Sequence, residues 1–70
     1  MNGSVEICNG KIINIKDIRA MNRLDEDDSI YYGIWLTRDR FYQHKVLKKH
    51  KWEIKEFDYL MENNFTDTLY

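Results

Sequence analysis

The clearest alternation of hydrophobic and other positions spans residues 29–37, Ser-Ile-Tyr-Tyr-Gly-Ile-Trp-Leu-Thr. On a strand, one face would carry four large apolar side chains: Ile30, Tyr32, Ile34 and Leu36. The other face would carry two aromatic rings and a glycine: Tyr31, Gly33 and Trp35. A period of two, with β-branched and aromatic residues on both sides, is typical of a strand covered on both faces. The pattern therefore predicts a central, two-sided strand.

A hairpin is predicted at the start of the chain. Asn9-Gly10 lies between two β-prone runs, and Asn-Gly favours a type I′ turn because both of its positions have positive φ. We expect strands over residues 4–8 and 11–16. A two-residue turn would place Cys8 opposite Lys11 and Ile7 opposite Ile12.

Residues 17–28 give a weaker pattern. Ile18, Met21 and Leu24 recur every three positions, which allows a short helical turn, although the pattern drifts around the helical wheel and Asn22 weakens it. The acidic run that follows, residues 25–28, predicts a charged and exposed turn that leads into the central strand.

A helix is predicted over residues 38–50. Thr37 is suited to cap its first turn, where Asp39 is favourable to the helix dipole, and Lys48, Lys49 and His50 are favourable in the last turn. Four side chains would share the buried arc: Tyr42, Gln43, Val46 and Leu47.

The last twenty residues allow two interpretations. Trp52-Glu-Ile54 alternates as a strand does, which favours a short strand over residues 51–57 followed by a helical turn over 58–63. A single helix over 53–63 is the alternative, because four apolar side chains gather on one side of it: Ile54, Phe57, Leu60 and Met61. We expect residues 65–70 to form a loose tail. The whole pattern predicts an α+β domain: a small, mostly antiparallel sheet of the hairpin and the central strand, packed by one main helix, with a short C-terminal strand or helix.

The length and composition of the chain limit its domain number, its possible cross-links and its location. Seventy residues make one domain, 1–70, with a small core. Cys8 is the only cysteine, so no internal disulfide can form, and a partner chain would be one way to stabilise so small a domain. The N-terminal residues lack the basic and apolar regions of a signal peptide. These features predict a cytoplasmic protein.

Chemistry-bearing residues do not assemble into a recognisable site. His44 and His50 would lie about 240° apart on a helix and so could not chelate one ion. The acidic run lacks the glycine and the ligand spacing of a calcium loop. Cys8 and the serines have no evident base or orienting partner, and the scattered glycines form no phosphate-binding loop. We expect no metal, no cofactor and no enzymatic activity.

Aromatic content points to a binding role. Aromatic residues make up 14% of the chain, more than so small a core can bury, and exposed aromatic side chains often dominate protein interfaces. We expect a protein that modulates another macromolecule by protein–protein contact, with a homodimer as a further possibility. Short, proline-free chains rich in Asn, Ile, Lys and Tyr are common among phage and mobile-element accessory proteins, which suggests an inhibitor or anti-defence factor acting in a host cytoplasm. The predicted contact residues are Tyr31, Trp35, Phe41, Tyr42, Trp52, Tyr59 and Phe65.

Nucleic-acid binding is the alternative. Residues 38–51 hold six of the eleven basic side chains and one acid, Asp39, and as a helix they would present a basic face to phosphates. Against this, the chain has a formal net charge of −1 and no helix-turn-helix or RNP pattern. The predicted contacts to nucleic acid or to an acidic partner are Arg38, Arg40, Lys45, Lys48, Lys49 and Lys51.

Overall fold

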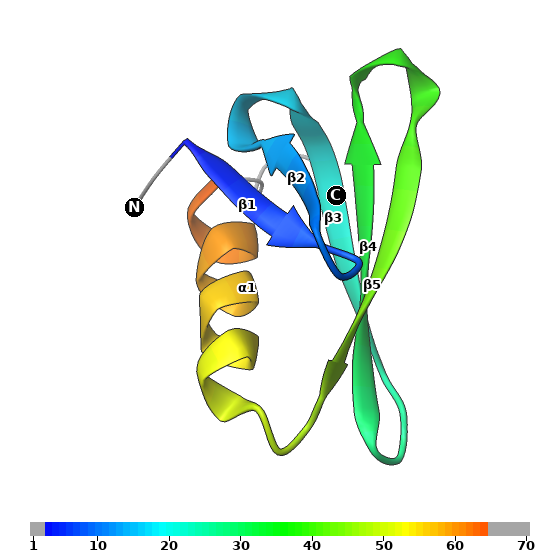
Figure 1. Ribbon diagram of the computed structural model, residues 1–70, viewed down its shortest axis with the longest axis vertical. Helices are drawn as coiled ribbons and strands as arrows, with labels where there is room; N and C mark the ends of the chain where they lie inside the picture. The colour runs from blue at the N-terminus through cyan, green and yellow to red at the C-terminus, as the bar shows by residue number, and fades with distance from the viewer. Residues whose placement is uncertain (1–2, 65–70) are drawn as a thin grey trace.

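A computed structural model describes residues 3–64 of the chain (Figure 1). It contains a two-stranded antiparallel sheet, a three-stranded antiparallel sheet of order β3-β4-β5, and one helix. The elements are β1 (Ser4–Ile7), β2 (Lys11–Asn14), a 3₁₀ turn (Ile15–Asp17), β3 (Ile18–Asp25), β4 (Ser29–Leu36), a second 3₁₀ turn (Thr37–Asp39), β5 (Phe41–Leu47) and α1 (Lys51–Asn64). The predicted α+β class is confirmed.

The N-terminal hairpin forms, with a register that differs by one residue from the predicted one. Ile7 pairs with Lys11, so the loop has three residues, and Cys8, Asn9 and Gly10 all have positive φ, of 49°, 60° and 118°. Cys8 therefore belongs to the turn and not to the first strand. The second strand ends at Asn14 because a 3₁₀ turn redirects the chain into β3.

The helical turn predicted within residues 17–28 is wrong, since β3 occupies most of that segment. The spacing of three that suggested a helix comes from a β-bulge between Ile18 and Ala20. An extra residue in a strand shifts the alternation by one, so Ile18 and Met21 both face the core and are buried. Leu24 falls on the opposite face, where 52% of its surface is exposed.

The helix predicted over residues 38–50 is also wrong. Arg38 and Asp39 have positive φ in a tight turn, and the chain then continues as β5, which pairs antiparallel with β4 from Trp35–Phe41 to Ser29–Leu47. Strand pairing prevails because β4 is buried and its backbone N–H and C=O groups need partners along both edges. A helix in this segment could not have supplied them.

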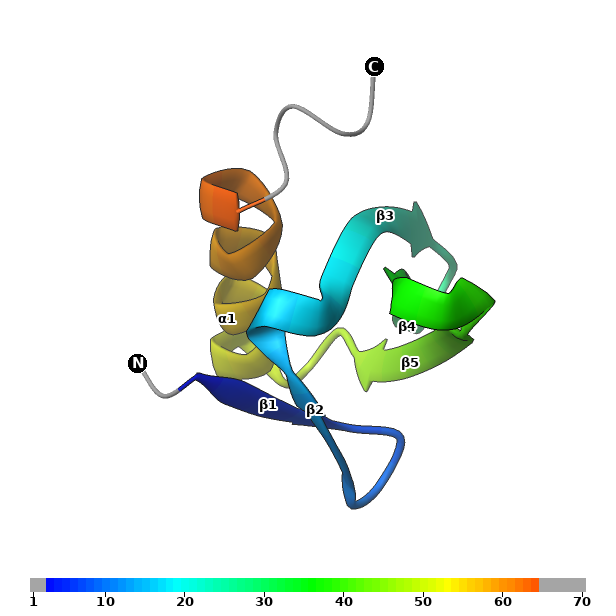
Figure 2. The same ribbon diagram turned by 90° about the horizontal axis from the view of Figure 1, so that it is seen from above.

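Residues 51–64 form the single helix that was the alternative interpretation, and the predicted strand over 51–57 is absent. Figure 2 shows α1 on one side of the three-stranded sheet. Phe57 is 1% exposed, and its ring lies 5.1 Å from that of Tyr32 and 4.8 Å from that of His44. Among the residues that the structure describes, eleven apolar side chains form the core: Ile7, Ile13, Ile18, Met21, Ile30, Tyr32, Ile34, Leu36, Val46, Phe57 and Leu60.

His44 connects the hairpin, the sheet and the helix. Its Nδ1 accepts a hydrogen bond of 2.9 Å from the backbone N–H of Cys8. Because Nδ1 is an acceptor, the neutral ring carries its proton on Nε2, which donates to Glu53 Oε2 at 2.9 Å. The thiol of Cys8 donates to the carbonyl oxygen of Gln43 at 3.3 Å. These bonds hold the hairpin loop against β5.

Replacing His44 with Phe tests this connection. His44→Phe keeps a ring against Phe57 but removes both ring nitrogens, so the Cys8 N–H loses its acceptor. We expect a loss of about 1–3 kcal/mol in the free energy of unfolding, as for a buried donor left unpaired, and faster hydrogen exchange at the Cys8 amide.

Urea denaturation and amide exchange followed by NMR measure these two effects. His50→Phe is the matched control, because His50 is more exposed and its Nδ1 lies 3.9 Å from Glu53. Unchanged protection of the Cys8 amide in His44→Phe would contradict the assignment.

Candidate functional site

The candidate site is the face of the three-stranded sheet that points away from the core, here called the outer face. The paired register of β3, β4 and β5 places its side chains in three rows. The rows are Ala20, Trp35 and Phe41; Asn22, Gly33 and Gln43; and Leu24, Tyr31 and Lys45. Trp35 is 39% exposed and Phe41 48%. The central strand is thus covered on one face only, which corrects the prediction that both faces are covered.

Trp35 and Phe41 form a ridge at one end of this face. They pair across β4 and β5, and their ring centroids lie 4.8 Å apart at an angle of 47°. Cross-strand aromatic pairs of this kind fix each other's orientation. The ridge therefore presents two large apolar rings on a rigid support.

Gly33 occupies the centre of the outer face and is buried beneath its neighbours. Its N–H donates to Asn22 Oδ1 at 3.1 Å. A Cβ at this position would collide with that oxygen and approach Phe41 Cε1 to 3.2 Å. Glycine is thus required for Asn22 and Phe41 to lie close over β4.

Two open hollows lie at the two ends of the outer face. The first, of about 680 Å³, is lined by Arg19, Ala20, Trp35, Leu36 and Asp39. The second, of about 480 Å³, is lined by Leu24, Tyr31, Gln43, Lys45, Leu47, the β3–β4 turn (residues 26–28) and Ser29 at the start of β4. Both have enough space to accept side chains of a partner.

Charge differs between these two ends. The β4–β5 turn and the β3–β4 turn lie at opposite ends of the sheet (Figure 1). The end with the Trp35–Phe41 ridge carries three exposed arginines and one aspartate: Arg19, Arg38, Arg40 and Asp39. The other end carries three exposed acids and two lysines: Glu26, Asp27, Asp28, Lys45 and Lys48. The outer face is thus basic at one end and, in balance, acidic at the other.

The structure brings together only part of the predicted contact set. Tyr31, Trp35 and Phe41 share the outer face. Tyr42 is half-buried on the core side of β5, with Lys11 Nζ 5.3 Å from its ring centroid. Trp52 and Tyr59 are 68% and 58% exposed on α1, away from this face. Phe65 lies outside the described residues.

The predicted basic helix face does not exist, because residues 38–50 are not helical. Arg38 and Arg40 lie at the β4–β5 turn, and Lys45 lies at the far end of the outer face. Lys48, Lys49 and Lys51 belong to the connection from β5 to α1 and its first turn. The six residues therefore do not form one continuous phosphate-binding surface.

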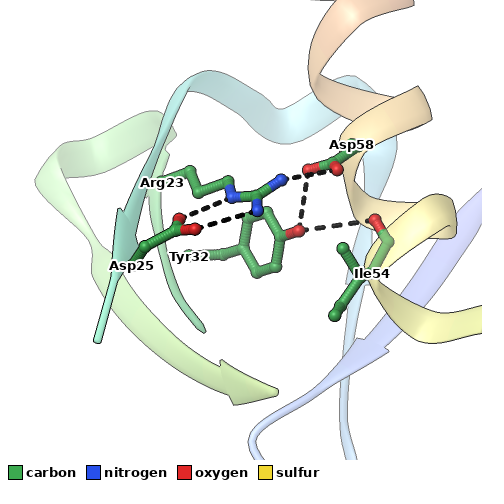
Figure 3. A network of polar contacts seen from close by, with 5 residues as sticks. All are labelled: Arg23, Asp25, Tyr32, Ile54 and Asp58. Atoms are coloured by element: carbon green, nitrogen blue, oxygen red, sulfur yellow. Dashed lines mark hydrogen bonds and ion pairs between the residues drawn. The ribbon is translucent and has the colours of Figure 1, made fainter. Parts of the chain in front are cut away.

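A network of polar contacts joins β3, β4 and α1 (Figure 3). Arg23 donates to both oxygens of Asp25, at 2.7 and 3.1 Å, and to Asp58 Oδ2 at 2.6 Å. The hydroxyl of Tyr32 donates to Asp58 Oδ1 at 2.7 Å. Burial, and then the bond to Asp58, raise the pKa of Tyr32 far above its usual value. A phenol held protonated in this way acts as a structural donor and not as a base.

Sequence reasoning missed this network because its members are up to 35 positions apart. The only local signal was the spacing of Arg23 and Asp25, which share one side of a strand. The hydrogen bonds from Arg23 lower the pKa of Asp25 below its usual value. The bond to Asp25 is also the main cause that raises the pKa of Arg23.

Comparisons with protein-family models, with curated proteins and with solved structures find no match to this chain. Within residues 3–64, no group of three or more His, Cys, Asp or Glu side chains is placed to hold a metal ion. No helix in this part of the chain has the length and apolar character needed to cross a membrane. The geometry and charge of the outer face therefore carry the functional argument.

The Arg23–Asp25 pair predicts a pH dependence of stability. Since the pKa of Asp25 is lower in the folded protein than its usual value of 3.8, its contribution is complete above that value and is lost as pH falls through the lower, folded pKa. We expect wild type to be more stable than Asp25→Asn near neutral pH, with the difference shrinking below about pH 4.

Urea midpoints measured from pH 7 to about pH 2.5 would follow this convergence. Asp27→Asn is the control, because it removes an equal charge two residues further along, in the β3–β4 turn, without touching Arg23. A gap between wild type and Asp25→Asn that stays constant down to the lowest pH would refute the role of the ionised pair.

Proposed function

We propose that this chain is a small, non-enzymatic protein-binding module that modulates another macromolecule through its outer face. The observation that carries the proposal is the exposed Trp35–Phe41 ridge, mounted on a sheet whose other face holds the core. Tryptophan, tyrosine and arginine are the side chains that most often dominate interface energies. All three types border this face, as Trp35, Tyr31 and Arg19.

The rigidity of the outer face supports its use as a protein-binding surface. Side chains on paired strands lose less freedom on binding than side chains on a loop, so less of the contact energy is spent on ordering them. The Trp35–Phe41 contact and the Gly33–Asn22 hydrogen bond already order this face in the free chain. Apolar patches of this kind on small proteins often mark contact sites.

The polar side chains support a binding role in preference to catalysis. Within residues 3–64, Tyr32, Arg23, Asp58, His44 and Glu53 are engaged in contacts that join elements of the fold. Composition adds the narrower proposal that the module is an inhibitor from a phage or mobile element that acts against a host defence in the cytoplasm.

Nucleic-acid binding is the second candidate function. Because the predicted basic helix does not form, the contact site for nucleic acid would be one end of the outer face. Trp35 and Phe41 could stack on bases there, and Arg19, Arg38 and Arg40 could contact phosphates. The acidic β3–β4 turn at the opposite end would repel the rest of a strand, so contact would be limited to a few nucleotides.

Photo-crosslinking tests the proposal. A photoreactive phenylalanine analogue replaces Phe41, and in a second variant it replaces Lys55, which is exposed on α1. Both are irradiated in extract of the host cell in which the chain is naturally produced. We expect a defined protein adduct from position 41 and not from position 55, and Trp35→Ala to reduce its yield at least about tenfold.

Digestion identifies the class of partner. An adduct removed by protease and not by nuclease supports the proposal. An adduct removed by nuclease would instead establish the second candidate. Equal labelling from positions 41 and 55, or no adduct at either, would refute the outer face as the recognition surface.

A further inference from the structure

We propose that the outer face binds the outer face of a second copy of this chain, with the strands of the two sheets running in opposite directions. The inference rests on the proposed function, since it takes the outer face to be a protein-contact surface and names one occupant for it. Three features carry it: the spacing of the rows, the shapes of the two ends and their opposite charges.

The rows are spaced as a two-fold arrangement requires. Trp35 and Tyr31 each lie two residues from Gly33 on β4, a distance of about 7 Å along a strand. A two-fold axis that passes over Gly33, parallel to the sheet and perpendicular to its strands, would exchange the two ends of the face. The Trp35 row of one copy would then lie over the Tyr31 row of the other.

The shapes of those rows are complementary. The Trp35–Phe41 ridge projects at one end, while the hollow of about 480 Å³ beside Tyr31 and Leu24 opens at the other. At the axis the two sheets would meet through the side chains that lie over Gly33, Asn22 and the edge of Phe41. Each copy would insert its ridge into the other copy's hollow, which gives two identical contacts, as an isologous dimer requires.

Charge selects this arrangement over the alternative face-to-face one. With the axis described, the arginine-rich end of each copy meets the acidic β3–β4 turn of the other, and Lys45 approaches the ring of Phe41, which lies on the same strand of the other copy, a favourable cation–π geometry. An axis parallel to the strands would instead set arginines against arginines and acids against acids. Repulsion at both ends disfavours that form.

The face is small for an interface. Three rows of three residues on three strands, with the turns at each end, fall at the lower limit of specific interfaces. We therefore expect a dissociation constant on the order of 10 μM. Because the charges are exposed, the dimer should weaken as salt increases.

Charge reversal on the purified chain tests the inference by sedimentation equilibrium. Arg19→Glu with Arg38→Glu makes both ends acidic, and Glu26→Lys with Asp27→Lys makes both ends basic. We expect each pair to weaken the dimer at least about tenfold. The chain carrying all four reversals exchanges its ends, and only the antiparallel arrangement predicts that it recovers wild-type affinity.

Two further variants serve as controls. Lys51→Glu with Lys55→Glu makes the same change in charge on α1 and should leave the dimer unchanged. Trp35→Ala should weaken the dimer without altering charge. Circular dichroism and the urea midpoint establish that each variant is folded.

Several results would overturn the inference. These are a wild-type chain that stays monomeric at millimolar concentration, a dimer insensitive to the single-end reversals, or a four-reversal chain that remains monomeric. Failure here is distinguishable from failure of the proposed function. A monomeric chain that still forms a protein adduct from position 41 in extract would retain the function and exclude only the second copy as occupant.

Discussion

The packing of Phe57 against Tyr32 and His44 is the interaction on which the rest of the structure depends. It joins α1 to β4 and β5, with ring centroids at 5.1 and 4.8 Å. The two partner residues extend it with polar contacts, since Tyr32 donates to Asp58 and His44 connects Cys8 to Glu53. One cluster thus holds the helix, the sheet and the hairpin together.

This cluster also explains why the outer face remains open. One 14-residue helix and a short hairpin can cover only one side of a three-stranded sheet. Antiparallel sheets tolerate this, because one face can lie on a core while the other meets solvent. What distinguishes this chain is that its uncovered side carries Trp35, Phe41 and Leu24, where polar side chains would ordinarily lie.

The charge of the outer face differs between its two ends, and this difference can orient a bound partner. The two turns that join β3, β4 and β5 carry charge of opposite sign, while the centre carries Gly33. An apolar surface supplies affinity without orientation, and charges at its ends supply orientation and selectivity. An apolar face with opposite charges at its two ends supports binding to a specific partner and argues against nonspecific hydrophobic association.

The candidate site was predictable in part. Tyr31, Trp35 and Phe41 were identified from sequence because their types are common at interfaces, but sequence could not separate them from Tyr42 and Trp52. That separation depends on which strands pair. Likewise, the contacts from Arg23 to Asp58 and from Cys8 to His44 span 35 and 36 positions, beyond any local pattern.

The sequence by itself determined the hairpin, the central strand, the acidic turn and the α+β class, because each rests on local alternation or on turn chemistry. The tertiary structure decided the secondary structure of residues 18–25 and 38–50, where the local sequence pattern suggests a helix. Pairing with β4 outweighed that preference, since a buried strand needs hydrogen-bond partners at both edges and only neighbouring strands can provide them. The same pairing turned a predicted basic helix face into a sheet face with opposite charges at its two ends.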